Sequence, residues 1–265
     1  MLAHRLIARL DIKGPSVVKG VQMEGLRVMG KPEELVVNYC NEADELLYID
    51  TVASLYGRNQ LGNLLEKSTH HAFVPVTVGG GINSVDEGRR LFDAGADKIA
   101  VNTQAIKRPM LIREFADSYG SQAVTVSIQA KRQGASWEAY TDCGRERSGK
   151  DAIAWAHEAC ALGAGELLVT SIDRDGTRQG FDLDLMRHFV DMPVPVIASG
   201  GMGALRHLKE LFDLGITAAA FASVLHYGKI TLREMRNVLG KDYPIRQLAE
   251  GDLCHWQRQA GGSKA

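Results

Sequence analysis

The sequence predicts a single (βα)₈ barrel, an α/β fold, with a two-fold internal repeat of half-barrels. Short apolar runs alternate with amphipathic stretches along almost the whole chain, a pattern typical of parallel strands joined by helices. The strand and glycine pattern of the first half returns in the second. The length of 265 residues suits one such barrel. Two small domains are the alternative, placed second because no Ser- or Pro-rich linker divides the middle.

Eight short apolar runs fit the eight barrel strands. They cover residues 5–10, 45–49, 75–78, 98–101, 123–128, 166–170, 195–198 and 218–221. The clearest helical patterns between them are residues 84–94, 109–119, 151–162 and 205–214. We therefore expect one barrel domain over residues 1–247, with half-barrels at about 1–120 and about 121–247.

The internal repeat is inferred from matched spacings. Residues 74–81 read Val-Pro-Val-Thr-Val-Gly-Gly-Gly, and residues 194–201 read Val-Pro-Val-Ile-Ala-Ser-Gly-Gly. Each segment begins 21 residues before a further glycine, Gly95 or Gly215. The triplet Glu-Leu-Leu precedes both segments, at 45–47 and 166–168. Three features in register indicate two related halves rather than chance similarity in a glycine-rich chain.

Composition excludes several classes of function. The formal net charge of −1 gives no electrostatic reason to expect binding to nucleic acid or to an anionic membrane. No run of about 18 apolar residues is present to span a bilayer, and the N-terminus lacks the pattern of a signal peptide. The four cysteines are scattered, so we expect reduced thiols in the cytoplasm, with no metal site and no redox cofactor.

Each half carries a candidate phosphate site in the loops that follow two of its strands. In a (βα)₈ barrel these loops gather at one end, and glycine allows backbone N–H groups to approach an anion. The glycines could instead only permit tight turns, but their match between halves favours phosphate. The two sets are Gly80, Gly81, Asn102 and Thr103 in the first half, and Gly200, Gly201, Ala222 and Ser223 in the second.

Aspartates stand at three predicted strand ends. They are Asp11, Asp50 and Asp173, and Asp175 follows two residues later. Partial burial would raise the pKa of such a carboxyl toward neutrality and suit it to general acid or base catalysis. The alternative is that each caps a helix or pairs with a lysine such as Lys19. The further residues expected to line the substrate site are Lys19, Asp50, Ser171, Asp175 and Gly176.

These stretches together resemble HisF, the family of cyclase subunits of imidazole glycerol phosphate synthase in histidine biosynthesis. The resemblance is carried by Arg-Leu-Asp-Ile-Lys at 9–13, Thr-Val-Gly-Gly-Gly-Ile at 77–82, Ser-Ile-Asp-Arg-Asp-Gly-Thr at 171–177 and Ala-Ser-Val at 222–224. It runs from Met1 to about Gln247. Residues 248–265 lie beyond it, and we expect them to form a loosely ordered tail.

The resemblance implies a partner and a reaction. Members of the family dock a HisH-type glutaminase at the N-terminal face of the barrel and receive its ammonia through the barrel interior. They act on a ribotide with a phosphate at each end, which gives imidazole glycerol phosphate and an aminoimidazole carboxamide ribotide. The ring of charged residues that gates the ammonia path matches Arg5, Glu45, Lys98 and Glu166. Their plain structural alternative is an ion-pair network that closes the barrel bottom.

The family's catalytic positions show a departure. Its two catalytic aspartates fall at Asp11 and at Gln129. An amide cannot exchange a proton near neutral pH, although it can hydrogen-bond a substrate. If a proton transfer depended on that carboxylate, a loss of roughly 10²–10⁴ in rate is expected. Arg9 also replaces the family's usual cysteine, and it would depress the pKa of Asp11 if the two side chains meet.

Three functions are consistent with these residues. In the first, the chain is an imidazole glycerol phosphate synthase cyclase that tolerates glutamine. In the second, it is a HisF-like paralogue that delivers ammonia to another acceptor, such as a sugar nucleotide amidated in surface-polysaccharide synthesis. In the third, it is a non-catalytic barrel that binds and activates a glutaminase.

Overall fold

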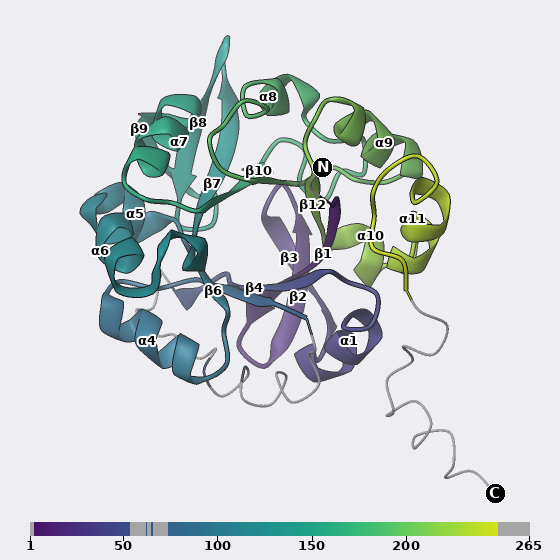
Figure 1. Cartoon of the computed structure of the whole chain (residues 1–265), viewed down its shortest axis with the longest axis horizontal. Helices are drawn as coiled ribbons and strands as arrows, with labels where there is room; N and C mark the ends of the chain where they lie inside the picture. Colours follow the sequence, from purple (N-terminus) through teal and green to yellow (C-terminus); the bar gives the residue numbers. More distant parts are fainter. Residues whose placement is uncertain (1–2, 54–61, 63–64, 66–73, 249–265) are drawn as a thin grey trace, which may run out of the picture.

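The computed structural model describes residues 3–53, 62, 65 and 74–248, and it forms a closed barrel of eight parallel strands (Figure 1). Strand β1 pairs with β12 and β4, and the β7–β10 pairing links the two halves. The strands are β1 (Arg5–Lys13), β4 (Glu45–Asp50), β5 (Val76–Gly79), β6 (Lys98–Val101), β7 (Val124–Gln133), β10 (Glu166–Ser171), β11 (Val196–Ser199) and β12 (Ala218–Phe221). All eight predicted strands are confirmed.

Helices surround the sheet (Figure 1). They are α1 (Pro32–Tyr39), α4 (Val85–Asp93), α5 (Thr103–Lys107), α6 (Met110–Tyr119), α7 (Ala152–Ala161), α8 (Leu183–Arg187), α9 (Leu205–Asp213), α10 (Ser223–His226) and α11 (Leu232–Leu239), with a 3₁₀ turn η1 (Ser121–Ala123). The four predicted helices are confirmed. Ser84 and Asp151 cap α4 and α7, because their side chains accept backbone N–H bonds of the first turn. Among the described residues, no helix has the length and apolarity needed to cross a membrane.

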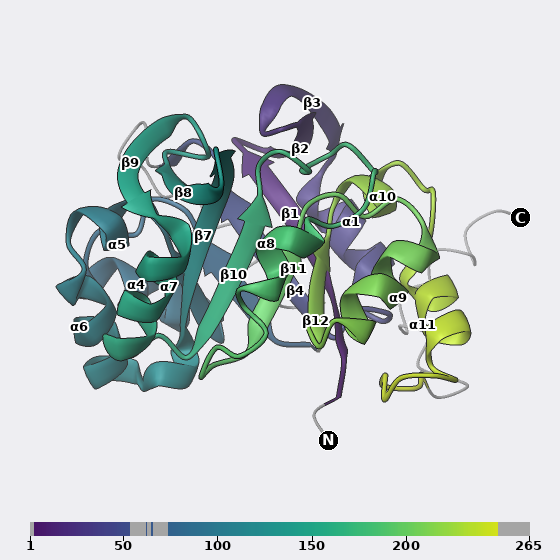
Figure 2. The same ribbon diagram turned by 90° about the horizontal axis from the view of Figure 1, so that it is seen from above.

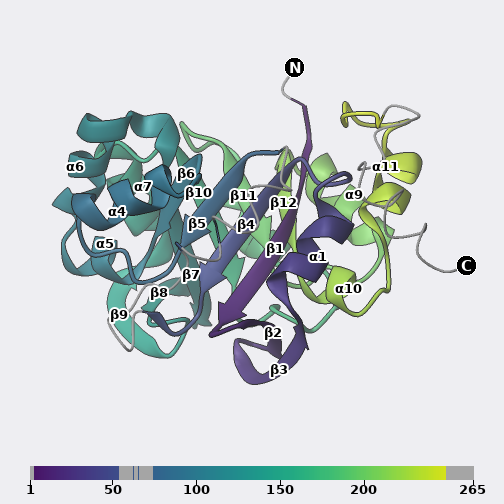
Figure 3. The same ribbon diagram turned by 90° about the horizontal axis from the view of Figure 1, so that it is seen from below.

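Two β-hairpins extend the barrel strands and were not predicted. The first, β2 (Ser16–Val21) with β3 (Glu24–Gly30), continues from β1; the second, β8 (Ser136–Thr141) with β9 (Glu146–Asp151), continues from β7. Strands β3 and β9 are largely exposed; β9 is polar, and the apolar residues of β3 are interrupted by Arg27, so neither has a continuous apolar run. Both hairpins rise from the end of the barrel opposite the N-terminus (Figures 2 and 3).

Alternation along the strands divides the interior into layers. On β1, Arg5, Ile7 and Arg9 share the inner face, whereas Leu6 and Ala8 pack outward against the helices. Charged residues form the bottom layer, and polar residues the top layer. The apolar layer between them contains Ile7, Leu47, Ile49, Ala100, Leu168, Ile197, Ala218 and Ala220. The interior is therefore a packed core with polar groups at both ends.

Matching positions in the two halves adopt matching backbone conformations. The residue before α5, Asn102, has φ −132° and ψ −86°, and its counterpart before α10, Ala222, has φ −126° and ψ −75°. Gly80 and Gly200 both have positive φ, at 109° and 95°. A hairpin follows the first strand of each half. The predicted internal repeat is therefore present in the backbone. Of the expected C-terminal tail, residues 249–265 lie outside the described residues.

Candidate active site

The first predicted phosphate site surrounds a hollow at the hairpin end of the barrel. Gly80, Gly81, Asn102 and Thr103 line it, and its empty volume is about 620 Å³. Gly80 also has a structural reason to be glycine: an added Cβ would collide with the backbone oxygen of Asp50. The glycines thus serve a tight turn and line an open hollow at the same time.

The second predicted site surrounds a matching hollow of about 300 Å³. Its lining includes Gly176, Gly200, Gly201, Ala222 and Ser223. Here too a side chain is excluded, because a Cβ on Gly201 would collide with the carbonyl of Gly180. The structure therefore brings each predicted set together, on residues contributed by separate strand ends.

A third hollow, of about 380 Å³, lies between the other two. It shares Gln129 and Cys143 with the first hollow and Asp175 with the second. Asp11 and Lys19 also line it. Because each outer hollow shares lining residues with the central one, the three hollows are neighbours that follow one another from one half-barrel to the other, and the two positions that resemble the family's catalytic pair line the central hollow.

Two of the predicted residues have mainly structural contacts. The Ser171 hydroxyl is buried and donates to Asp182 at 3.0 Å, and Ser171 lines none of the three hollows. Asp50 lines the first hollow, but its Oδ1 accepts the backbone N–H groups of Val52 and Ala53, each at 2.9 Å. Burial nonetheless raises the pKa of Asp50. Asp50 therefore caps the backbone that follows its strand, which is the structural alternative given above for these aspartates.

Asp11 is held by two cations. Its Oδ1 accepts from Arg9 Nε at 2.8 Å, and its Oδ2 accepts from Lys19 Nζ at 3.3 Å. Lys19 also binds both oxygens of Asp175, at 2.9 and 2.7 Å. Burial disfavours the charged form of Asp11, but the charges of Arg9 and Lys19 outweigh it and lower its pKa to about 2. The expected Arg9 effect is confirmed, and the general expectation of a raised pKa is wrong for Asp11.

Arg9 crosses the barrel interior beneath this site. Its Nη1 donates to the hydroxyls of Thr170 on β10 and Ser199 on β11, at 3.0 and 3.1 Å. Arg9 and both hydroxyl residues are buried. The guanidinium therefore joins β1 to two strands of the other half-barrel, a role that sequence reasoning did not predict.

Gln129 occupies the position on β7 that corresponds to Asp11 on β1. It pairs with Tyr140 of β8 and Thr170 of β10, and it is 5% exposed. Within the described part of the chain, its side-chain oxygen Oε1 has no hydrogen-bond partner. A buried acceptor without a donor lowers the stability of the folded protein. The requirements of folding therefore do not explain why an amide oxygen is buried here.

Sequence reasoning missed Cys143 and Arg145, which the β8–β9 turn brings to the central hollow. Asp142 and Cys143 both have positive φ, at 50° and 57°. The stretch Thr-Asp-Cys-Gly was the available signal, because Asp and Gly favour such turns. Burial, with the nearby charge of Asp11, raises the pKa of the Cys143 thiol to about 11. Neither Asp11 nor Cys143 therefore titrates near neutral pH.

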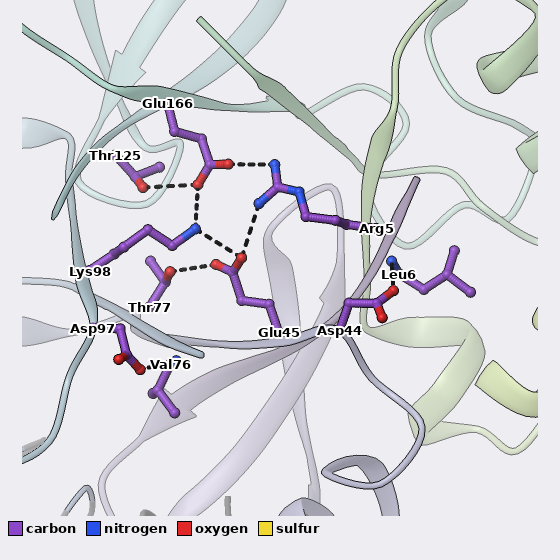
Figure 4. A network of polar contacts seen from close by, with 10 residues as sticks. All are labelled: Arg5, Leu6, Asp44, Glu45, Val76, Thr77, Asp97, Lys98, Thr125 and Glu166. Atoms are coloured by element: carbon purple, nitrogen blue, oxygen red, sulfur yellow. Dashed lines mark hydrogen bonds and ion pairs between the residues drawn. The ribbon is translucent and has the colours of Figure 1, made fainter. Parts of the chain in front are cut away.

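The four predicted gate residues meet at the opposite end of the barrel (Figure 4). Arg5 contacts Glu45 at 3.1 Å and Glu166 at 2.5 Å. Lys98 contacts the same two carboxylates at 2.8 and 2.7 Å. Each of the four is the first residue of its strand, which places the ring at the N-terminal face. Thr77 and Thr125 donate hydroxyl bonds to the two glutamates.

Among the described cysteines, Cys143 and Cys160 are free thiols. Over the described part of the chain, no group of three or more His, Cys, Asp or Glu is arranged to hold a metal ion.

Comparison with known proteins gives consistent matches. A family model described as "Histidine biosynthesis protein" matches residues 5–231. Three similar curated proteins are each named imidazole glycerol phosphate synthase subunit HisF. The one from Legionella pneumophila is 55% identical over 204 residues, which cover 76% of this chain and 96% of that protein. The one from Pyrococcus furiosus is 47% identical over 249 residues (93% and 99%), and the one from Prochlorococcus marinus is 44% identical over 255 residues (94% and 100%).

Proposed function

We propose that this chain, which belongs to the HisF family of histidine biosynthesis proteins, is the ammonia-using cyclase subunit of an imidazole glycerol phosphate synthase. The observation that carries the proposal is the row of three hollows across the barrel mouth. A long ribotide with a phosphate at each end would lie along this row. Its products would be imidazole glycerol phosphate and an aminoimidazole carboxamide ribotide.

The phosphates would bind in the outer hollows. In the first, Gly80, Gly81, Asn102 and Thr103 would surround one phosphate; in the second, Gly176, Gly200, Gly201, Ala222 and Ser223 would surround the other. Backbone N–H groups at glycine-rich turns are suited to this task because they approach an anion without side-chain obstruction.

The middle of the ribotide would lie against Asp11 and Gln129. Asp11, paired with Arg9 and Lys19, would act as a fixed negative charge that stabilises positive charge on the reacting nitrogen atoms. Gln129 would hydrogen-bond the ligand without exchanging a proton. Lys19, Asp50 and Asp175 would complete the walls of the site, with Ser171 supporting them from behind.

Ammonia would come from a HisH-type glutaminase docked at the N-terminal face, in a cytoplasmic heterodimer. The ring of Arg5, Glu45, Lys98 and Glu166 closes that face, and it would have to open for ammonia to enter. The apolar layer above the ring would then carry a small neutral molecule toward the central hollow. The names of the relatives, each a synthase "subunit", support a second chain.

Complementation of a bacterial strain that lacks its cyclase tests the proposal. Growth without histidine is expected when the gene is supplied, and purified protein with the ribotide and ammonium salt should form imidazole glycerol phosphate. Absence of both growth and product, with folded protein, would overturn the cyclase assignment.

One observation favours the two other candidate functions. Gln129 is neutral, and two cations hold Asp11 in its charged form. Neither of these two positions therefore offers a carboxyl that titrates near neutral pH. A paralogue that passes ammonia to another acceptor, such as a sugar nucleotide, needs no such group, nor does a barrel that only activates a glutaminase. Tight glutaminase binding without cyclase activity would support these two.

A further inference from the structure

We infer that Arg9, Thr170 and Ser199 form a second closure inside the barrel, and that Arg9 is the positioning residue that admits ammonia to the central hollow. These three residues are called the upper gate here, which separates them from the charged ring at the N-terminal face. The inference rests on the proposed function only for the identity of the molecule that passes. It goes beyond that function by placing a second barrier on the route.

The first support is the reach of the Arg9 side chain. Around the closed sheet, β11 and β10 are the second and third strands from β1, and the fourth, β7, lies opposite. Arg9 starts on β1, yet its Nη1 donates to Ser199 on β11 at 3.1 Å and to Thr170 on β10 at 3.0 Å. The strand that it passes, β12, presents the small side chains of Ala218 and Ala220 to the interior. The guanidinium therefore extends across most of the barrel interior.

The second support is the height of the upper gate. Each of its members comes two residues after a member of the apolar layer on the same strand, and those members are Ile7, Leu168 and Ile197. Because alternate residues of a strand share a face, the upper gate lies directly above the apolar layer. Arg9 also lines the central hollow, although it is only 5% exposed. The upper gate therefore separates the apolar layer from the central hollow.

The third support is the unequal strength of the bonds that Arg9 makes. Its Nε donates to the carboxylate of Asp11 at 2.8 Å, so both partners of that bond are charged. Its Nη1 donates to two neutral hydroxyls. Hydrogen bonds between charged partners are roughly twice as strong as neutral ones. Nη1 can therefore release the hydroxyls while Nε keeps the side chain attached to Asp11.

The donors and acceptors of the upper gate suit neutral ammonia. The lone pair of ammonia can accept from Arg9 Nη1 in place of a hydroxyl, and its N–H groups can donate to the oxygens of Thr170 and Ser199. Ammonium has no lone pair, and the guanidinium repels its charge. The upper gate therefore exchanges hydrogen bonds with ammonia as it passes, and holds ammonium back.

Thiol labelling tests whether the upper gate closes the interior. The Ile197→Cys substitution places a thiol in the apolar layer directly below Ser199, and methyl methanethiosulfonate is the small neutral probe. Adding Arg9→Ala is expected to speed labelling of this thiol about tenfold, because a route opens from the central hollow. Mass spectrometry of the peptides measures the rate. The parallel substitution Val169→Cys, on the outer face of β10, reports any general loosening of the fold.

The matched control is Arg145→Ala. Arg145 also lines the central hollow, but its Nη1 donates to the backbone oxygen of Asp142 in its own turn, at 3.3 Å. Its removal takes a cation from the same hollow without opening the interior. The thiol introduced by Ile197→Cys should therefore react at the same rate as with Arg145 present.

A second variant tests the closure if Arg9→Ala does not fold. Thr170→Val combined with Ser199→Ala removes both acceptors of Nη1 and leaves the pair of Arg9 with Asp11 intact. The released side chain is then populated more often. Labelling below the upper gate is expected to become about fivefold faster, while labelling on the outer face of β10 stays unchanged.

Passage of ammonia is tested in the complex with the HisH-type glutaminase. The same double variant should raise the ratio of product formed from glutamine to product formed from ammonium salt about fivefold. Ammonia from glutamine must pass the upper gate, whereas ammonia from the salt also reaches the central hollow from the barrel mouth. A purely structural role of the two hydroxyls would change both rates together and leave the ratio as it is.

The outcomes separate the inference from the proposed function. Labelling below the upper gate that is equally fast in the gate variants and in the parent background would overturn the inference, and so would an unchanged ratio of the two product rates. If the parent chain forms no product from either nitrogen source, the proposed function fails. The labelling result then still decides whether the upper gate closes the interior, because it does not depend on cyclase activity.

Discussion

The ends of strands β1 and β7 hold corresponding places in the two half-barrels, yet they are built from opposite chemistry. At the end of β1, Asp11 is fixed by two cations, and one of these, Lys19, comes from the attached hairpin. At the end of β7, Gln129 is neutral and its oxygen has no partner among the described residues. The repeated backbone thus tolerates an ionic centre and a neutral one, because strand pairing and turns depend little on these side chains.

Restoring a carboxyl to the second centre should give the largest effect. With free ammonia and the ribotide, the Gln129→Asp variant is expected to form product about 10²–10⁴ times faster than the parent chain, since a general acid or base contributes that factor. Absorbance or chromatographic detection of the products measures it. Gln133→Asp, on the exposed end of the same strand, is the control. Folded protein that forms no product in either the parent or the variant form would contradict the cyclase assignment.

Removing a cation from the first centre should give the next largest effect. The Lys19→Met variant leaves Asp11 and Asp175 buried with one charge too few, and its free energy of unfolding should fall by about 3–5 kcal/mol. Urea denaturation measures this change. The control is Lys131→Met, because Lys131 on β7 lies over the ring of Tyr140 and forms no salt bridge among the described residues. A loss below 1 kcal/mol for Lys19→Met would show that the first centre is not held ionically.

Acid should weaken the first centre selectively. The pKa of Asp11 is lowered from 3.8 to about 2 by folding, so its contribution to stability is present above about pH 4 and is lost as the pH falls toward 2. That contribution is about 2 kcal/mol at neutral pH. The stability difference between the parent chain and Asp11→Asn should therefore shrink between pH 5 and pH 3. A constant difference would contradict the ion-pairing of Asp11.

The smallest effects are expected where the halves are most alike. Gly80→Ala and Gly200→Ala both force a side chain into positive φ, and each new Cβ meets a backbone carbonyl, that of Asp50 or Ser171. We expect each to cost about 1–2 kcal/mol, which thermal melting detects as a drop of several degrees. Similar stability losses for the two variants would show that the half-barrels are alike in energetics as well as in backbone conformation. A large difference would show that only the backbone conformation is alike.

The sequence alone predicted the barrel, its eight strands and both glycine-lined hollows. These features follow from local patterns: apolar runs, repeated spacings and glycine after a strand. It did not predict the hairpins, whose outer strands are largely exposed and have no continuous apolar run, or the arrival of Cys143 at the central hollow. Nor did it predict that Arg9 reaches Thr170 and Ser199, since those contacts join residues 161 and 190 positions apart. Such contacts depend on barrel closure, which a single sequence does not display.

The position of Arg9 also has a consequence for synthesis on the ribosome. The residues that accept its Nη1, and the strand β12 that pairs with β1, all emerge late. A nascent chain that ends near residue 120 therefore presents the β1 and β6 edges unpaired, with both hydrogen bonds of Arg9 Nη1 still to be made. The first half-barrel is expected to remain unfinished, and prone to aggregate if released, until the last strand has left the exit tunnel.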